Sequence, residues 1–264
     1  MRLVDSHAHL QAERFDADVG LVLGGARLAG VERILVPGWD VGSTERSLAL
    51  VEQFPWLDAS AGVHPHDAAA VDAAGWARMR ELAAHPRVVA IGETGLDFDR
   101  EFSPRRAQVD NLRRNLALGV ETGKPVILHC RSAAGRRDAQ DALLDEVRRA
   151  SGVRPLVHSY SGPVDYAQAM LELGATISFS GLAFRSGEEA SAEVAALVPD
   201  DRLLVETDSP FLPPPGAPRR RNEPEWVRVT AAWLAERRGA DPDTLGAALV
   251  ATYDRLFPRP ERPA

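Results

Sequence analysis

Histidines supply the first sign of chemistry in this chain, because six of the seven each follow a short apolar segment. Two carboxylates, Glu93 and Asp208, follow apolar segments in the same way, whereas His85 lies in a connection and is assigned a structural role. Imidazole and carboxylate groups together suit divalent transition ions. The sequence therefore predicts a metal-dependent site built from segments that are distant along the chain. The six histidines are His7, His9, His64, His66, His129 and His158.

The strongest local signal is the pair His7 and His9. Residues i and i+2 of an extended strand point to the same side, so both imidazoles can bind one ion. Any one of the strand-end histidines, taken alone, equally fits a hydrogen-bonded core position. The candidate ligands together exceed the needs of a mononuclear site, so we expect two ions. These candidates are His7, His9, Glu93, His129, His158 and Asp208.

Other polar residues near these candidates are expected to support the site rather than bind metal. His66 is assigned a structural or supporting role, and Asp5 is expected to orient a neighbouring ligand. Asp97 is expected to cap a loop or to support a ligand. Glu206 alternates with the candidate ligand two residues later and could share its side of the strand, so its exclusion as a ligand is left open.

Short apolar runs alternate with longer amphipathic ones along the chain, which is typical of strands and helices around a parallel sheet. The runs expected as buried strands are residues 3–4, 33–36, 57–62, 88–91, 126–128, 155–157, 175–178 and 202–205. The expected helices are residues 18–29, 43–53, 76–84, 104–122, 136–149, 164–173, 188–197, 224–237 and 242–256.

Eight such units in roughly 250 residues have the usual size of a (β/α)8 barrel, whose active site lies where the strands end. We therefore expect an α/β fold, a single TIM barrel with an extra C-terminal helix over residues 1–258, and a flexible tail over 259–264. From the first candidate ligand, intervals of 57, 29, 36, 29 and 50 place the others on strands 3, 4, 5, 6 and 8. An open doubly wound sheet shares this alternation, but no GxGxxG motif follows the first strand.

Composition limits the classes of partner. The net charge from 31 basic and 38 acidic residues is −7, which disfavours a broad grip on duplex nucleic acid. No apolar run suits a membrane span or a secretory leader, so the cytoplasm is the expected location, and no obligate protein partner is evident. The single cysteine, Cys130, excludes an intramolecular disulfide.

The only lysine, Lys124, bears on how two metals could be bridged. Some binuclear barrel hydrolases use a carbamylated lysine at a strand end for this purpose. Lys124 is expected at the start of a strand, five residues before His129, and so at the opposite end of the barrel from the site. A carboxylate must then form the bridge. Glu93 is the best candidate, because it lies between the two groups of histidines in strand order.

A series of motifs in this chain resembles those of the TatD family of metal-dependent deoxyribonucleases, in the family's order. The motifs are DSHAHL from Asp5, GVHPH from Gly62, IGETGLD from Ile91, PVILHCR from Pro125, HSYSG from His158, ETDSP from Glu206 and RNEP from Arg221. The resemblance implies a TIM barrel of the amidohydrolase-like superfamily. One departure is Ser159-Tyr160, where the family often has Cys-Phe, which changes a pocket wall but removes no ligand.

The resemblance also implies a role for each matching residue. His64 would lie near the scissile phosphate and either stabilise its charge or protonate the leaving oxygen. Arg131, Arg221 and Asn222 would meet the substrate or support the site. The implied ligands are His7, His9 and Asp208 for one ion, His129 and His158 for a second, and Glu93 as the bridge.

By this resemblance, the expected function is hydrolysis of DNA phosphodiester bonds, as a 3'-5' exonuclease on single-stranded or frayed ends. Two divalent ions, Mg²⁺ or Mn²⁺ with Zn²⁺ as the alternative, would activate water, with Asp208, Glu93 and His64 as the catalytic residues. Tyr160 or Phe184 is expected to stack a base. Two alternatives stay open: a binuclear hydrolase of esters, amides or lactones, including aminoacyl-tRNA, and a non-catalytic metal-binding protein.

Overall fold

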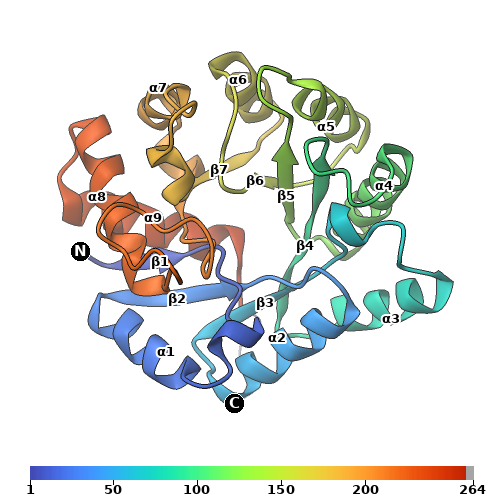
Figure 1. The fold of residues 1–264 in the computed structure, drawn as a ribbon, viewed down its shortest axis with the longest axis horizontal. Coiled ribbons are helices and arrows are strands. Elements are labelled where there is room, and N and C mark those ends of the chain that lie inside the picture. The colour runs from blue at the N-terminus through green and yellow to red at the C-terminus, as the bar shows by residue number, and fades with distance from the viewer. Residues whose placement is uncertain (260–264) are drawn as a thin grey trace.

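Eight short strands pair in parallel and in chain order around a ring, with helices on its outside (Figure 1). This computed structural model describes residues 1–259. The strands are β1 (Leu3–Asp5), β2 (Val31–Val36), β3 (Leu57–Ala61), β4 (Val88–Asp97), β5 (Val126–Arg131), β6 (Pro155–Val157), β7 (Thr176–Phe179) and β8 (Leu203–Val205). We call the end of the ring at which these strands terminate the mouth.

Each strand is followed by an α-helix, and a ninth helix in the described residues packs against β1, β8 and α8. Local sequence sets several helix ends: Asp40 caps α2 by accepting a hydrogen bond from the backbone N–H of Ser43, and Gly123 ends α4 in the left-handed conformation. The helices are α1 (Val19–Leu28), α2 (Val41–Gln53), α3 (Ala73–Ala83), α4 (Arg105–Thr122), α5 (Asp138–Arg149), α6 (Val164–Glu172), α7 (Ala190–Leu197), α8 (Val227–Arg238) and α9 (Pro242–Leu256).

The strands are buried on both faces, which explains why they read as nearly continuous apolar runs. Every residue of β1, β3, β4, β6, β7 and β8 is buried. One face packs inside the ring and the other lies under the helices. Polar groups that project from these strands into the mouth therefore lie in a dry surrounding, where electrostatic interactions are strong.

Backbone hydrogen bonds beyond β1 and β8 join the two ends of the barrel sequence. The N–H of Asp208 donates to the carbonyl of His7 over 2.8 Å, and the N–H of His9 donates to the carbonyl of Ser209 over 2.7 Å. Asp208 adopts a φ of +54° at this junction, a region that aspartate tolerates better than most residues. These hydrogen bonds, which we call the seam, place Asp208 beside His7 and His9, although it follows them by 201 and 199 positions in the sequence.

The structure confirms the expected TIM barrel with its extra C-terminal helix. The strand ends were predicted less well. β4 runs on to Asp97 and β5 to Arg131, because their pairing continues through Gly95 opposite His129 and into the mouth. Glu93 and His129 therefore lie within strands, where we expected them to follow the strand ends.

The described part of the expected tail packs against strand β3. Arg259, the first residue of the expected tail, donates from Nε to Asp58 over 2.8 Å, and residues 260–264 lie outside the described part of the chain. None of the helices in residues 1–259 is both long and apolar enough to cross a bilayer.

The close approach of β4 to β5 yields a test of the fold. Gly95 has a φ of +141°, and a Cβ at this position would overlap the carbonyl oxygen of His129. We expect Gly95→Ala to lower the free energy of unfolding by about 1–3 kcal/mol through overpacking and strain, as measured by urea denaturation. Gly20→Ala in α1, where a Cβ would meet no atom within 4 Å, is the matched control and should cost nothing. Equal stability of the two variants would contradict this packing.

Candidate metal centre

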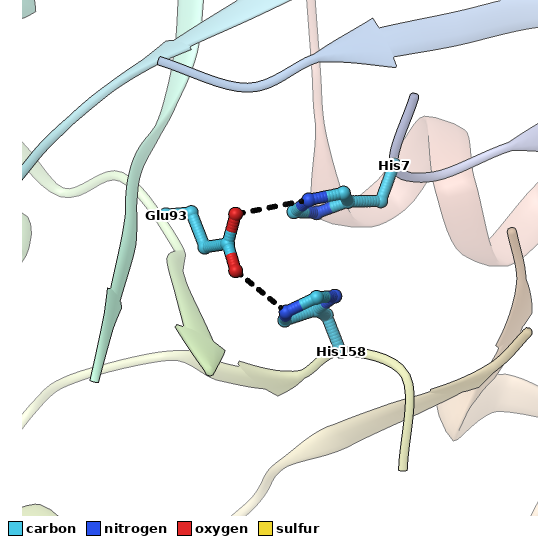
Figure 2. Close-up of side chains that lie close together, drawn as sticks. All are labelled: His7, Glu93 and His158. Carbon is cyan, nitrogen blue, oxygen red and sulfur yellow. Dashed lines mark ion pairs between the residues drawn. The ribbon is translucent and has the colours of Figure 1, made fainter. Parts of the chain in front are cut away.

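Glu93 lies at the centre of the mouth, between histidines from opposite sides of the barrel. Its Oε2 is 3.2 Å from Nε2 of His7 and 3.5 Å from Nε2 of His9. Its Oε1 is 2.9 Å from Nε2 of His158, and Figure 2 shows one carboxylate oxygen facing His7 and the other facing His158, whose rings stack 4.1 Å apart. The two oxygens of one carboxylate therefore face different groups of histidines.

The first group comes from the seam between β1 and β8. The Nε2 atoms of His7 and His9 are 3.2 Å apart. Oδ1 of Asp208 is 3.3 Å from Nε2 of His9 and 3.7 Å from Nε2 of His7. These three side chains offer ligand atoms that all lie within 4.8 Å of one another, as a metal site requires.

The second group gathers around Oε1 of Glu93. Besides His158, Nδ1 of His129 lies at 3.2 Å and Nε2 of His64 at 3.3 Å. His64 is thus as close to the carboxylate as His129 is, although the resemblance separates their roles. We call the seven side chains of the two groups the cluster: His7, His9, His64, Glu93, His129, His158 and Asp208.

The cluster is not satisfied by its own hydrogen bonds. The facing Nε2 atoms of His7 and His9 can share only one proton when both rings are neutral, and Nδ1 of each ring is buried without a hydrogen-bond partner. Buried polar atoms normally have partners. A divalent cation between the facing Nε2 atoms and the carboxylate oxygens would pair these nitrogens without a shared proton, although it would leave both Nδ1 atoms without a partner. The donor set therefore fits a metal site.

Electrostatics divide the histidines of the metal-free cluster. Burial lowers the pKa of His158 and of His129, but neighbouring carboxylates outweigh it and raise both pKa values above the usual histidine range. Burial lowers the pKa of His7, so this ring stays neutral with a lone pair available. Burial raises the pKa of Glu93, but the surrounding imidazoles, His158 above all, outweigh it and hold this pKa well below its usual range. Glu93 is therefore an anionic carboxylate at neutral pH.

Glu206 supports the ring of His158 from behind. Its Oε1 is 3.1 Å from Nδ1 of His158, and its Oε2 accepts hydrogen bonds from Ser178 over 2.5 Å and Ser6 over 3.3 Å. Glu206 is fully buried, and its carboxylate contacts the outer nitrogen of the ring. Sequence reasoning placed Glu206 beside Asp208 but missed this contact, because it crosses from β8 to the end of β6.

Asp97 and Asp5 occupy similar supporting positions. Asp97 is 2.8 Å from Nε2 of His66 and 3.5 Å from Nε2 of His129, and it accepts the backbone N–H of Arg100, which confirms its loop-capping role. Asp5 accepts hydrogen bonds from the backbone and the hydroxyl of Thr207, and burial raises its pKa to about 8. Both carboxylates fix the backbone that presents the cluster.

The two candidate substrate arginines are held by acidic neighbours. Nε of Arg131 donates to Asp99 over 2.8 Å, and the side chain is half exposed at the rim of the mouth. Arg221 makes a two-pronged pair with Asp18, over 2.9 and 2.8 Å, and a further pair with Glu223. Arg221 therefore ties the segment after β8 to the segment after β1.

Asn222 lies beneath the mouth rather than in it. It is fully buried, and its side-chain amide donates to the carbonyls of Thr207 over 2.9 Å and Leu212 over 3.3 Å. These contacts hold the loop that presents Asp208. In this arrangement Asn222 supports the site and makes no contact with the open mouth.

Lys124 and Cys130 do not take part in the cluster. Lys124 lies at the start of β5, away from the mouth, and its Nζ donates to the carbonyl of Ala83 over 2.5 Å. A lysine bridge is thereby excluded, as the sequence predicted. Burial raises the pKa of the Cys130 thiol to about 12, so this residue offers no thiolate at neutral pH.

The expectation that Tyr160 or Phe184 stacks a base is wrong for Tyr160, which is fully buried with its hydroxyl bonded to Pro163. Phe184 packs against Trp233. The structure instead exposes Phe102 and Phe211 at the mouth, two residues that sequence reasoning missed. Their position in the sequence could have indicated them, because each lies in a loop that follows a strand with a sequence motif.

Comparison with known proteins agrees with this geometry. The TatD related DNase family profile matches residues 4–258. One similar protein is the uncharacterized metal-dependent hydrolase YabD of Bacillus subtilis, which is 35% identical over 97% of this chain and 98% of the relative. Another is the 3'-5' ssDNA/RNA exonuclease TatD of Cronobacter sakazakii, 36% identical over 99% of this chain and 100% of the relative.

Solved structures give the same result. YJJV, a TatD homolog from Escherichia coli K12, superposes with a TM-score of 0.89 at 31% identity, covering 98% of this chain and 99% of that one. A lactonase from Deinococcus radiodurans, with a TM-score of 0.64 at 17% identity over 97% of this chain and 95% of that one, shares the fold alone. With the family matched along nearly the whole sequence, the chain belongs to the TatD related DNase family.

Proposed function

We propose that this protein is a metal-dependent exonuclease that removes nucleotides from the 3' ends of single-stranded or frayed DNA. The observation that supports it most is the placement of Glu93, whose two oxygens face different, adjoining groups of ligand atoms. Two metals on one carboxylate form the arrangement that clamps a phosphodiester. The name of the Cronobacter relative, a 3'-5' ssDNA/RNA exonuclease, supports the direction and the substrate.

We propose His7, His9 and Asp208 as ligands of one ion, His129 and His158 as ligands of a second, and Glu93 as the bridge. The outer contacts of the rings support this division. Nδ1 of His158 lies at hydrogen-bond distance from Glu206, whereas Nε2 of His129 makes no hydrogen bond and lies 3.5 Å from a carboxylate oxygen of Asp97. A carboxylate at the outer nitrogen holds the proton there and leaves the inner nitrogen free to bind metal.

His64 differs from these ligands in its outer hydrogen bond. Its Nδ1 accepts the backbone N–H of His66 over 3.1 Å, so the proton of the neutral ring lies on Nε2, which faces the cluster. A protonated Nε2 is a donor, not a ligand. Burial lowers the pKa of His64 to about 4, so the ring is neutral at pH 7. We therefore assign His64 to donate a hydrogen bond to a phosphoryl oxygen.

The chemistry of the site then divides among the protein's own groups. Bound divalent cations, Mg²⁺ or Mn²⁺ with Zn²⁺ as the alternative, supply charge neutralisation at the phosphate and acidify water. Asp208 faces His9 through Oδ1, its proposed ligand atom, and is assigned to accept the proton of the attacking water on its second carboxylate oxygen. Glu93 contacts both groups of side chains and so fixes their relative position. The buried strands exclude bulk water around them. Arg131 lies at the rim, where its fork can meet a neighbouring phosphate.

The charge balance of the protein fits a strand end better than a duplex. The exterior is acidic, with a net charge of −7, so phosphate is attracted only where cations gather at the mouth. A nucleic acid that needs many backbone contacts gains little from such a surface. A single-stranded end needs only one phosphodiester in the mouth, so it can bind without many backbone contacts.

The nuclease function is tested by release of mononucleotides from a 3'-labelled single-stranded oligonucleotide. With Mg²⁺ or Mn²⁺ the wild type should release the label, whereas chelated wild type and metal-supplied Glu93→Ala should lose about 100-fold or more in rate. A single-stranded RNA and a panel of carboxyl esters and lactones are run beside the DNA. Equal release in all three DNA reactions, or turnover of the ester panel alone, would refute the proposal.

The role of Glu206 gives a second test that does not depend on turnover. Removing the charge behind His158 should weaken Mn²⁺ binding by about tenfold, because carboxylates at the outer nitrogen strengthen a histidine ligand. We expect this loss for Glu206→Gln in a competition titration against a fluorescent chelator, with unchanged far-ultraviolet circular dichroism. Glu188→Gln, whose carboxylate accepts from Ser161 outside the cluster, is the matched control. Wild-type affinity in Glu206→Gln would show that the contact is only structural.

A further inference from the structure

Two phenylalanine side chains at the mouth are exposed to solvent, against the usual behaviour of large aromatic residues. Phe102 is 67% exposed and Phe211 is 50% exposed, and no other aromatic side chain in residues 1–259 is as open as either. Phe102 lies in the loop between β4 and α4, and Phe211 lies in the segment after β8. The segment after β8 also presents Asp208 of the cluster, and the loop after β4 follows the strand that carries Glu93.

Each exposed ring is anchored on a histidine of the site. The ring of Phe102 lies 4.7 Å from that of His66 at an interplanar angle of 77°, and the ring of Phe211 lies 5.8 Å from that of His9 at 74°. Such edge-to-face contacts fix the orientation of a ring but cover little of its surface. The phenylalanines are therefore held in place while much of each ring stays open.

The two rings lie at opposite ends of a chain of contacts that crosses the cluster. His9 is 3.5 Å from one oxygen of Glu93, and His64 is 3.3 Å from the other. The rings of His64 and His66 are 4.3 Å apart. The order of contacts is Phe211, His9, Glu93, His64, His66 and Phe102. A phosphodiester held at Glu93 would thus have one aromatic ring on either side.

We propose that Phe102 and Phe211 are base-stacking platforms for the two nucleotides that flank the scissile phosphodiester. This inference rests on the proposed nuclease function and specifies how the substrate is recognised. Every base has a π face, so stacking on phenylalanine binds any sequence. The guanidinium of Arg14 lies over the Phe211 ring, 5.9 Å from its centre, so a cation occupies one face of that ring and a base would stack on the other.

The platforms explain a preference for single strands. In a duplex both faces of each interior base are already stacked, so a base must leave its neighbours before it can lie on a phenylalanine. A frayed or single-stranded end has already lost those contacts. The expected substrate is therefore an unstacked 3' end in which the terminal and penultimate bases each lie on one ring.

The test crosses protein variants with abasic substrates. Metal-saturated wild type, Phe102→Ala and Phe211→Ala act on single-stranded oligonucleotides that are intact, or that carry an abasic tetrahydrofuran residue at the terminal or the penultimate position. Release of the first nucleotide gives kcat/KM. Leu28→Ala, which removes a side chain that is 92% exposed at the end of α1, is the matched control. Metal content is measured for every variant.

On the intact oligonucleotide each phenylalanine variant should lose about tenfold in kcat/KM, mainly through KM, with full metal content and no loss in Leu28→Ala. Removal of the base that lies on a given ring should cost the wild type the same factor and cost the matching variant nothing further. One variant should show this coupling at the terminal position and the other at the penultimate position.

Other outcomes overturn the inference in distinguishable ways. If both variants lose the same factor on abasic and intact substrates, the rings act on the backbone or on the histidines beneath them. Coupling of both variants to one position contradicts platforms on opposite sides of the cluster. Normal rates in both variants, with an active wild type, leave the nuclease proposal standing and refute the platforms. A wild type that releases no nucleotide from any substrate refutes both.

Discussion

Glu93 brings an anionic carboxylate into a dry mouth lined by five histidine rings, and its two oxygens divide those rings into two groups. Such a charge is stable there only because ring nitrogens surround it, and the crowded nitrogens in turn need cations to satisfy them. The barrel meets this constraint because its parallel strands β1, β3, β4, β5, β6 and β8 all end at one face. The backbone seam between His7 and Asp208 completes the arrangement across the ends of the barrel sequence.

The contacts behind the rings decide what each histidine does. His158 and His129 have carboxylates at their outer nitrogens, whereas His64 has a backbone N–H. Three rings at similar distances from Glu93 therefore differ in their outer contacts, and our assignment of two metal ligands and one donor to phosphate rests on this difference. Phe102 and Phe211, the proposed base-stacking residues, also contact histidines of the site. In these proposals metal binding and substrate binding depend on one connected set of side chains.

Much of this arrangement could be predicted from the sequence, because it depends on patterns of fixed period. Alternating apolar and amphipathic runs predicted the barrel, and histidines beside the strand ends predicted which residues meet. The extension of β4 through Glu93 could not be predicted, because it depends on pairing with β5 beyond the apolar core. The contact of Glu206 with His158 and the exposure of Phe102 could not be predicted from the sequence either. They depend on side chains that meet across the barrel or on loops without periodic sequence.

The central claim is that Glu93 bridges two metal positions, and anomalous diffraction from crystals grown with Mn²⁺ tests it most directly. The account predicts two anomalous peaks, one beside Oε2 with His7, His9 and Asp208, and one beside Oε1 with His129 and His158, with His64 contacting neither. A single peak, or a peak coordinated by Nε2 of His64, would contradict it.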